Sequence, residues 1–422
     1  MAATYTKSLS VDFGGNINIS QLQQEIGNDE GITPTCSHIT NNSDDVDIVF
    51  DTALSTGEQT TLDTIITNHT PWVYNDTNLY DAIVDAGHTG DYTSISEAFS
   101  AGHRSVFIRN GVYVETTDVV LPDYANLIGE SGGNVVIYFV GAYSVKADGS
   151  GGAKETTGTI SCMKNTKDVV GMGTTFTNLS VDDFILLGTN YFGISSITDN
   201  TNLVLKDTFR GKSLLAMPYT AQTMKTGIKI TNCIITNSSG VGVYCRALRH
   251  FVLDSVSMKG NNPNLQIEDC GDGGMKHLLV ESGTGVGVFV NNCKSLNISV
   301  ADIYNNTSHG IEIKGDSESV VLYSCETSNN GGTGVCLIEN IKDINITDCV
   351  SKYNEGNGFL SGSSTQHLMI NTSTSGGNKL KGMSMDGIKN NICSNIIIDN
   401  EDIGLHIMSD KMISSSNFIE GN

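Results

Sequence analysis

Charged, amide and aromatic side chains recur at fixed places in a pattern that repeats between residue 242 and the C-terminus. Two glutamates, Glu268 and Glu312, stand in copies two apart. If each copy forms one layer of stacked strands, their backbones lie roughly 10 Å apart by the strand spacing of a sheet. Paired carboxyl groups near that separation suit an inverting glycosidase, with one acid and one base. The alternative is a solvated surface, because the chain carries 46 acidic residues.

The residues around this pair favour sugar binding. Aromatic rings offer flat faces for stacking, and amide and charged groups offer hydrogen bonds between the rings. Arg246 and Lys314 would hold anionic groups of a polysaccharide. The same surface without turnover would be a receptor-binding strip. The expected binding residues are Tyr244, Arg246, Gln266, Phe289, Asn291 and Lys314.

These residues need a repeating scaffold, and the sequence contains one. A fixed short period indicates a solenoid, in which each repeat buries its apolar face against its neighbours. The period is 22 to 24 residues, and its opening phrase, mostly Gly-apolar-x-apolar, begins at Gly242, Asn264, Gly287, Gly310, Gly334, Gly358, Gly382 and Gly404. Alternation inside the phrase sends every second side chain outward. The outward residues form two columns: Tyr244, Gln266, Phe289, Glu312, Cys336, Leu360, Ser384 and His406 in one, and Arg246, Glu268, Asn291, Lys314 and Ile338 in the other.

A second apolar segment follows in each repeat, from residues 251–253 in the first to 396–398 in the last, and an asparagine then marks a corner. Asn tolerates the left-handed backbone and can bond a neighbouring backbone, so a stack of Asn is expected there. Cys325 and Cys349 are 24 residues apart and are expected to stack in the core. The corner asparagines are Asn306, Asn330, Asn354, Asn378, Asn400 and Asn422.

This pattern resembles the right-handed parallel β-helix of pectate-lyase-like proteins, over residues 78–422. The start of the coil is also similar to that of many β-helices, with a short helix at 95–99 that would cover the first apolar edge. The rival solenoid, a leucine-rich repeat, needs a leucine-dominated consensus and a helical segment in each repeat. Neither is visible. The catalytic motifs of pectin methylesterases, polygalacturonases, pectate lyases and alginate epimerases are absent, so the resemblance implies a fold and no particular activity.

The expected fold class is mainly β, with four segments. Residues 1–75 form a small α/β anchoring domain, and a linker begins at Pro71 and Trp72 near the end of this segment. Residues 78–153 start the β-helix with its capping helix, residues 154–223 form an inserted small β-barrel or sandwich, and residues 224–422 form the remaining coils. The insertion resembles a domain recurrent in bacteriophage tail and appendage proteins, through its Gly-x-Gly-Thr-x-Phe turn at 171–176 and the run at 196–203. The N-terminal domain resembles a module of some viral structural proteins.

These resemblances imply a virion protein of a phage or a large DNA virus. Its N-terminal domain would bind other virion proteins, and its β-helix would be a rigid appendage that meets a cell-surface polysaccharide. The last coil ends at a corner position without a visible cap, and an uncovered coil end is an aggregation hazard. We therefore expect a homo-oligomer, a trimer by resemblance to viral β-helices. The alternative function is a polysaccharide depolymerase, either a glycoside hydrolase or a lyase.

Composition excludes several partners. A net charge of −22 argues against nucleic acid and against an anionic membrane surface. No apolar run is long enough for membrane insertion, and no signal peptide is visible, so we expect synthesis in the cytoplasm and a place in the virion. The ten cysteines are expected to be buried free thiols, and no cofactor is expected. Residues 269–274 have the composition of a turn that could bind calcium, with an ordinary glycine-rich turn as the alternative.

Overall fold

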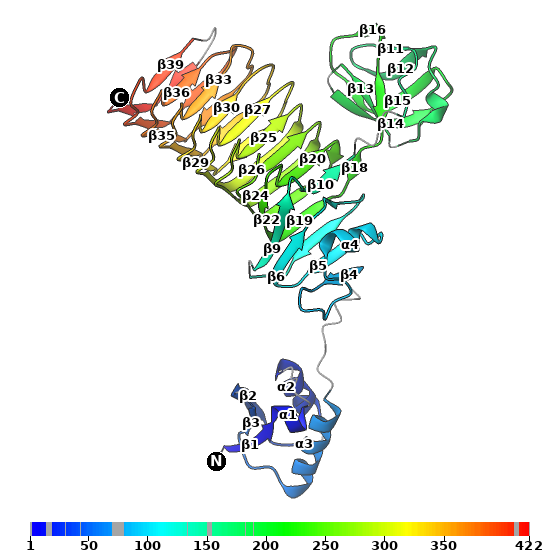
Figure 1. Ribbon diagram of the computed structural model, residues 1–422, viewed down its shortest axis with the longest axis vertical. Coiled ribbons are helices and arrows are strands. Elements are labelled where there is room, and N and C mark those ends of the chain that lie inside the picture. The colour runs from blue at the N-terminus through cyan, green and yellow to red at the C-terminus, as the bar shows by residue number, and fades with distance from the viewer. Residues whose placement is uncertain are drawn as a thin grey trace. The chain divides into compact units, whose positions relative to one another are not determined.

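The alternating segments that open each repeat form the strands of one parallel sheet (Figure 1). Their inward residues, such as Val243 and Cys245, are fully buried. Rungs pair in register, with Val243 opposite Leu265 and Val288 opposite Ile311. The ten strands are β7 (Val119–Val120), β10 (Val145–Asp148), β20 (Val243–Arg246), β23 (Leu265–Glu268), β25 (Val288–Asn291), β27 (Ile311–Lys314), β30 (Val335–Leu337), β33 (Phe359–Ser361), β36 (Met383–Met385) and β39 (Leu405–Ile407). The predicted mainly β, parallel β-helix fold is confirmed.

The structure is a computed structural model that describes residues 2–13, 19–29, 31–42, 44–69, 80–132, 134–149, 154–181, 183–188, 190–408 and 413–421. The chain divides into two compact units, Met1–Leu79 and Tyr80–Asn422. The linker predicted at Pro71 and Trp72 and the corner predicted at Asn422 lie outside the described residues. Of the helices within these ranges, none combines the length and the apolar character that a membrane crossing requires.

The later coils have three strands each, not the two that the sequence indicates. The second and third strands stack on their counterparts in a 21-stranded sheet. They are separate in the later coils and merge into long strands in β22, β24 and β26. The strands are β4 (Ala82–Val84), β5 (Ser105–Ile108), β6 (Gly111–Glu115), β8 (Asn126–Gly129), β9 (Val135–Gly141), β18 (Lys225–Thr226), β19 (Lys229–Ser238), β21 (Leu248–Arg249), β22 (Val252–Lys259), β24 (Gly271–Glu281), β26 (Lys294–Tyr304), β28 (Val321–Tyr323), β29 (Glu326–Ser328), β31 (Asn345–Thr347), β32 (Val350–Lys352), β34 (Met369–Asn371), β35 (Thr374–Gly376), β37 (Asn391–Cys393), β38 (Ile396–Ile398), β40 (Ile413–Ser415) and β41 (Phe418–Glu420).

The missed third strand has a physical explanation. Its inward positions are polar in three consecutive coils, Thr327, Ser351 and Ser375, and all three side chains are buried. A search for alternating apolar residues does not detect a strand whose inward residues are polar. Because the third strand is not recognised in this way, the sequence pattern wrongly assigns residues 396–398 to the second segment. Ile396 pairs with Thr374 of the third strand, whereas Ile392 pairs with Ile370 of the second.

The predicted asparagine stack is present at the corner after the third strand. Asn306, Asn330, Asn354, Asn378 and Asn400 are at most 2% exposed. Each amide of the first four donates to the side-chain oxygen of the next, at 2.9 to 3.0 Å. The left-handed residue is not the stacked Asn but the one before it, as at Asn305, Asn329 and Tyr353. The ladder therefore satisfies buried polar groups between coils, and the preceding residue makes the turn.

Most cysteines are buried free thiols, as the sequence predicted. All ten belong to the described residues and are free, and eight are buried. Cys325 and Cys349 are stacked neighbours, with the Cys325 backbone N–H donating to the Cys349 sulfur at 3.4 Å. Buried thiols of this kind behave as small apolar side chains.

A short helix, α4 (Ile95–Ser100), stands at the start of the coil, where Ile95, Ala98 and Phe99 are buried. The carboxylate of Glu115 fixes the first turn of this helix, a role that the sequence analysis did not predict. Glu115 is 2% exposed and accepts from the Ile95 backbone N–H at 2.7 Å and the Ser96 hydroxyl at 2.6 Å. These bonds satisfy helix-start donors that would otherwise be unpaired.

Between β10 and β18 the chain forms a seven-stranded sheet with its own core, which includes Phe176, Ile185 and Leu205. Its strands are β11 (Thr159–Cys162), β12 (Thr166–Met172), β13 (Phe184–Leu187), β14 (Asn190–Ile197), β15 (Asn202–Phe209), β16 (Leu214–Met217) and β17 (Thr220–Gln222), with the 3₁₀ helix η2 (Phe176–Asn178). We call this part the inserted domain. Phe184 packs with Met224 and Ala247, and Arg249 lies over the Phe184 ring at 5.3 Å, so the inserted domain contacts the coil.

The first unit is an antiparallel sheet with helices. The sheet order is β1-β3-β2, and the core includes Leu22, Ile48, Phe50 and Leu62. Its elements are β1 (Ala3–Ser8), α1 (Leu9–Asp12), α2 (Ile19–Asn28), β2 (Cys36–Asn42), β3 (Asp45–Phe50) and α3 (Thr56–Asn68).

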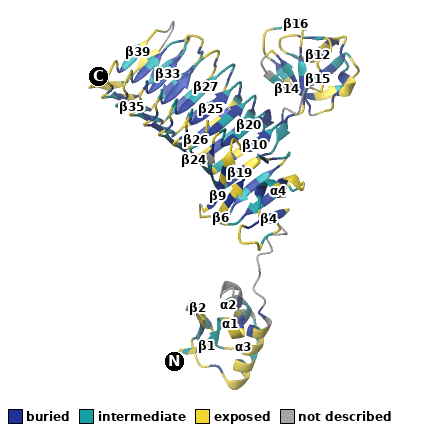
Figure 2. Cartoon of the chain, in the orientation of Figure 1, coloured by how far each residue is buried: buried dark blue, intermediate teal, exposed yellow. Residues whose placement is uncertain are grey.

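Figure 2 shows that buried residues alternate with intermediate and exposed ones along the coil strands.

Candidate functional site

The register of the ten-stranded sheet aligns the predicted binding and catalytic residues. One outward column reads Lys146, Tyr244, Gln266, Phe289 and Glu312, and its neighbour reads Asp148, Arg246, Glu268, Asn291 and Lys314. All ten side chains are half-buried, between fully buried inward neighbours. We call these ten residues the strip.

Lys146 and Asp148 were missed from the sequence. They belong to β10, and the inserted domain separates them along the chain from their partners in β20. The signal was present, because Val145 and Ala147 alternate with them and are buried like the apolar residues of the other phrases. Only the pairing shows that β10 precedes β20 in the same sheet.

Two aromatic rings of the strip each lie beneath a lysine. Lys146 Nζ is 5.9 Å from the centroid of Tyr244, and Lys314 Nζ is 4.7 Å from the centroid of Phe289. Tyr244 and Phe289 are two rungs apart, which is roughly 10 Å by strand spacing. Gln266 lies on the rung between them. The surface thus alternates flat apolar faces with hydrogen-bonding groups.

The Tyr244 hydroxyl also connects the two columns. It donates to Glu268 Oε2 at 3.1 Å. Partial burial, together with the nearby Glu268 carboxylate, raises the pKa of Tyr244 to about 12, so the phenol keeps its proton at neutral pH. Tyr244 therefore holds Glu268 in place from the rung below.

The two predicted catalytic glutamates do not face each other directly. Glu312 aligns with Phe289, and Glu268 aligns with Asn291. They are two rungs apart and two residues apart along the strand, so their backbones are separated diagonally by roughly 12 Å. Carboxyl groups of inverting glycosidases lie about 6.5–9.5 Å apart. The two side chains would have to point toward each other, over Phe289, to reach that range.

The first column changes character beyond Glu312. Cys336 pairs with Glu312 and Leu360, in the outward column predicted from the sequence, yet it is only 2% exposed. Burial, with the Glu312 carboxylate nearby, raises the pKa of the Cys336 thiol to about 12. Ile338 falls after the end of β30. The continuous run of polar and aromatic residues therefore ends at the rung of Glu312 and Lys314, before the buried Cys336 and the apolar Leu360.

Residues 269–274 are not a single turn, as the sequence suggested. Gly271 begins β24, and Gly273 faces Phe251 so closely that a Cβ there would lie 2.3 Å from the ring. Asp272 accepts from Arg249 Nε at 2.9 Å, and Asp269 pairs with Arg246 at 3.5 Å. Within the described ranges, no three His, Cys, Asp or Glu side chains form a group that could hold a metal. Calcium binding stays an untested prediction.

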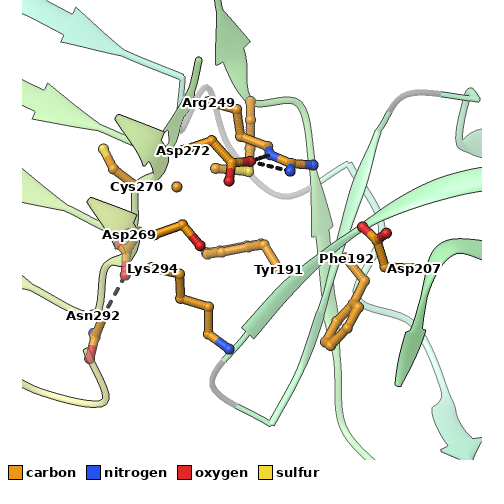
Figure 3. Close-up of a pocket in the computed structure, with 12 residues that line it drawn as sticks. Tyr191, Phe192, Asp207, Arg249, Asp269, Cys270, Asp272, Asn292 and Lys294 are labelled. Carbon is orange, nitrogen blue, oxygen red and sulfur yellow. Dashed lines mark hydrogen bonds and ion pairs between the residues drawn. The ribbon is translucent and has the colours of Figure 1, made fainter. Parts of the chain in front are cut away.

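Beside the strip, the inserted domain and the coil line an open cavity of about 240 Å³. Figure 3 shows Tyr191 extending from the inserted domain toward Asp269, with Phe192 and Asp207 beyond it. Arg249, Asp272 and Lys294 come from the coil. Burial raises the pKa of Tyr191, and the nearby Asp269 adds to this effect. No sequence motif marks this cavity, because it arises from two segments packed together.

Comparison with known proteins supports the architecture. The family model described as the right handed beta helix region matches residues 219–373 and 286–422, which together are just under half of the chain. With the parallel pairing of the coils, this match shows a right-handed parallel β-helix, as predicted. No curated protein matches the sequence.

Similar solved structures include three polysaccharide-related proteins. The tailspike of Acinetobacter baumannii bacteriophage AP22, in complex with an A. baumannii capsular saccharide, is 10% identical with a TM-score of 0.44, over 76% of this chain and 66% of the tailspike chain. Pectate lyase Pel9A is 11% identical with a TM-score of 0.38, over 79% of this chain and 77% of the lyase. The A-module of an Azotobacter vinelandii mannuronan C-5 epimerase, AlgE6, is 12% identical with a TM-score of 0.39, over 76% of this chain and 93% of the module.

Proposed function

We propose that the strip binds a polysaccharide chain that runs across the strands, along the axis of the coil. The observation that carries this proposal is the pair of rings, Tyr244 and Phe289, two rungs apart and each beneath a lysine. Their spacing of roughly 10 Å is about the length of two pyranose units in an extended chain. Sugar faces stack on such rings, and hydroxyl groups bond the polar groups between them.

The charges of the strip favour a polysaccharide with anionic groups. Lys146 and Lys314 form no ion pair with a carboxylate among the residues that the structure describes. Each ammonium is therefore available to a ligand carboxylate or sulfate above the adjacent ring. Because the whole chain carries a net charge of −22, binding should depend on these local cations and weaken as salt screens them.

In the wider context, we propose a virion appendage. The N-terminal unit would attach to other virion proteins, and the coil would present the strip to a cell-surface polysaccharide. We also propose a homo-oligomer, a trimer by the resemblance drawn from the sequence. Exposed apolar side chains on neighbouring rungs, Ile396 and Phe418, support a protein partner for that face of the coil, since large exposed apolar groups mark contact surfaces.

The binding proposal is tested with a panel of acidic and neutral polysaccharides and the Phe289→Ala variant. Loss of one stacking platform should weaken binding roughly tenfold, because aromatic contacts contribute about 0.5–1.5 kcal/mol beyond their buried area. The matched control is Tyr323→Ala, which removes an exposed ring from β28, on the other sheet. Absence of binding to every polymer, or equal binding by both variants, would refute the proposal.

A second candidate is a depolymerase, and the bond from Tyr244 to Glu268 favours it. The Tyr244 hydroxyl fixes the position of the Glu268 carboxylate beside the binding surface, and a general acid or base must be held in position in this way. Glu312 would be its partner. The test is the release of new reducing ends from a bound polymer, with ultraviolet absorbance to detect the unsaturated product of a lyase. Glu268→Gln and Glu312→Gln should each abolish release and keep binding. Full activity in both variants would remove this assignment.

A further inference from the structure

The cavity between the inserted domain and the coil has the composition of a sugar site. Phe192 and Tyr191 form one wall, and the Phe192 ring is held edge-on by Phe209 at 5.6 Å between centroids. Asp207, on the neighbouring strand β15, is exposed, and its carboxylate has no hydrogen-bond or ion-pair partner among the described residues. The opposite wall comes from the coil (Figure 3).

The charges of the lining argue against an anionic ligand. Both cations that reach the cavity are already neutralised, Arg249 by Asp272 and Lys294 by Glu318 at 3.0 Å. Two further carboxylates, Asp207 and Asp269, line the same space. Carboxylates accept hydrogen bonds from hydroxyl groups, and the paired guanidinium and ammonium groups still have N–H donors to offer.

The cavity has room for one small unit. Pockets for drug-sized ligands measure about 300–1,000 Å³, whereas this cavity has about 240 Å³. A single hexose ring, with one apolar face for Phe192 and hydroxyl groups for Asp207 and the coil, fits both the volume and the polarity.

The cavity also connects to the strip. Arg246, a strip residue, pairs with Asp269 at 3.5 Å, and Asp269 lines the cavity. Tyr191 is close enough to Asp269 and Arg246 for both charges to affect its pKa, which burial raises. A chain lying on the strip would therefore pass the mouth of the cavity at the rungs of Arg246 and Glu268.

We propose that this cavity binds a neutral sugar unit that branches from the polysaccharide held on the strip. The link to a polysaccharide rests on the proposed function, but the binding of a single sugar does not. The inserted domain would thus add selectivity for a branch to a surface that recognises the main chain.

A glycine that lines the cavity allows a direct test of sugar binding. Gly271 lines the cavity, its backbone is not left-handed, and an added Cβ would meet only the Lys294 carbonyl oxygen at 3.8 Å. Gly271→Leu should therefore fill the cavity without straining the coil. The matched control is Gly274→Leu, on the same strand but outside the lining, where an added Cβ meets nothing within 4 Å. Asp207→Asn is a second variant, at an exposed position where we expect the substitution to leave folding unchanged.

The probes are the methyl glycosides of glucose, galactose, mannose and N-acetylglucosamine, observed by saturation-transfer NMR with the full chain. At least one should bind the wild type and Gly274→Leu, lose its signal with Gly271→Leu, and bind roughly tenfold more weakly to Asp207→Asn. A bound glycoside should remain bound to Phe289→Ala, which alters only the strip.

The outcomes separate this inference from the function proposed for the strip. If no glycoside binds, or if Gly271→Leu binds as the wild type does, the cavity proposal is wrong, whatever the polymers do. If a glycoside binds the cavity but no polymer binds the strip, the proposed function fails and the single-sugar site remains. A glycoside signal that disappears with Phe289→Ala assigns the sugar to the strip and overturns the inference.

Discussion

Tyr244 and Phe289 have functional meaning because of what surrounds each ring. An isolated exposed aromatic residue is ordinary on a protein surface. Here each ring has an ammonium within 6 Å of its centroid, a distance at which cation and ring attract each other. That attraction holds the lysine over the ring in the free protein and leaves its charge close to a stacked sugar.

Glu155, in the inserted domain, is the residue whose titration should be visible in stability. It is 5% exposed and accepts from the Thr175 hydroxyl, from the Thr157 backbone N–H at 2.6 Å and from Asn178 Nδ2 at 3.2 Å. These bonds, the one from Thr175 above all, lower the pKa of Glu155 to about 2, whereas an unfolded glutamate has a pKa near 4.3.

Because the folded pKa is the lower one, the ionised carboxylate stabilises the fold fully above about pH 4.3, and this stabilisation is lost as the pH falls toward about 2. We expect the melting temperature of the wild type to drop over that window by more than that of Glu155→Gln. The measurement is thermal unfolding at a series of pH values, with Asp207→Asn as the control. Equal pH dependence in the wild type and Glu155→Gln would contradict this assignment.

At the scale of the elements, the asparagine ladder should be the most sensitive part of the coil. Asn354 is fully buried. It donates to Thr327 O at 3.1 Å and to Asn378 Oδ1 at 3.0 Å, and it accepts from the Asn330 backbone N–H at 3.0 Å. An alanine leaves these partners without water or a substitute, at a cost of about 1–3 kcal/mol for each buried group.

Asn354→Ala should therefore lower the free energy of unfolding by several kcal/mol or prevent soluble expression. Asn297→Ala, at an exposed position of β26, should change it by less than about 0.5 kcal/mol, as surface substitutions usually do. Denaturant unfolding measures both values. A small effect at Asn354 would mean that the ladder only fills space.

The elements also explain how far the sequence could predict the site. A single repeat period sets the register of the first strand, so the period alone aligns Tyr244, Gln266, Phe289 and Glu312 correctly. The third strand could not be found, because Thr327, Ser351 and Ser375 place polar groups in the core. The cavity beside Asp269 could not be predicted either, since its two walls lie on segments that only tertiary packing brings together.

At the scale of the whole molecule, the two units should be separable. The first unit has its own core, with Leu22, Ile48 and Leu62, and the coil core includes none of its residues. We expect residues 80–422 to fold alone, to melt as they do in the full chain and to bind the same polysaccharide. Calorimetry and the binding assay of the full chain provide the comparison. Loss of polysaccharide binding without residues 1–79 would show that the first unit takes part in recognition.

The oligomeric state belongs to the same scale. A trimer would cover exposed apolar side chains such as Ile396 and Phe418 in copies of one interface. Sedimentation equilibrium should give three times the chain mass, and Phe418→Asp should shift it toward the monomer. A monodisperse monomer of the wild type would contradict the proposal for the appendage but not the one for the strip.

The most direct measurement is a crystal structure of the protein with an oligosaccharide cut from a polymer that it binds. The account predicts sugar rings over Tyr244 and Phe289, with the chain crossing β20, β23 and β25 and polar contacts to Gln266 and Asn291. An oligosaccharide seated instead on the other sheet, near Tyr323, would contradict the central claim that the strip is the binding surface.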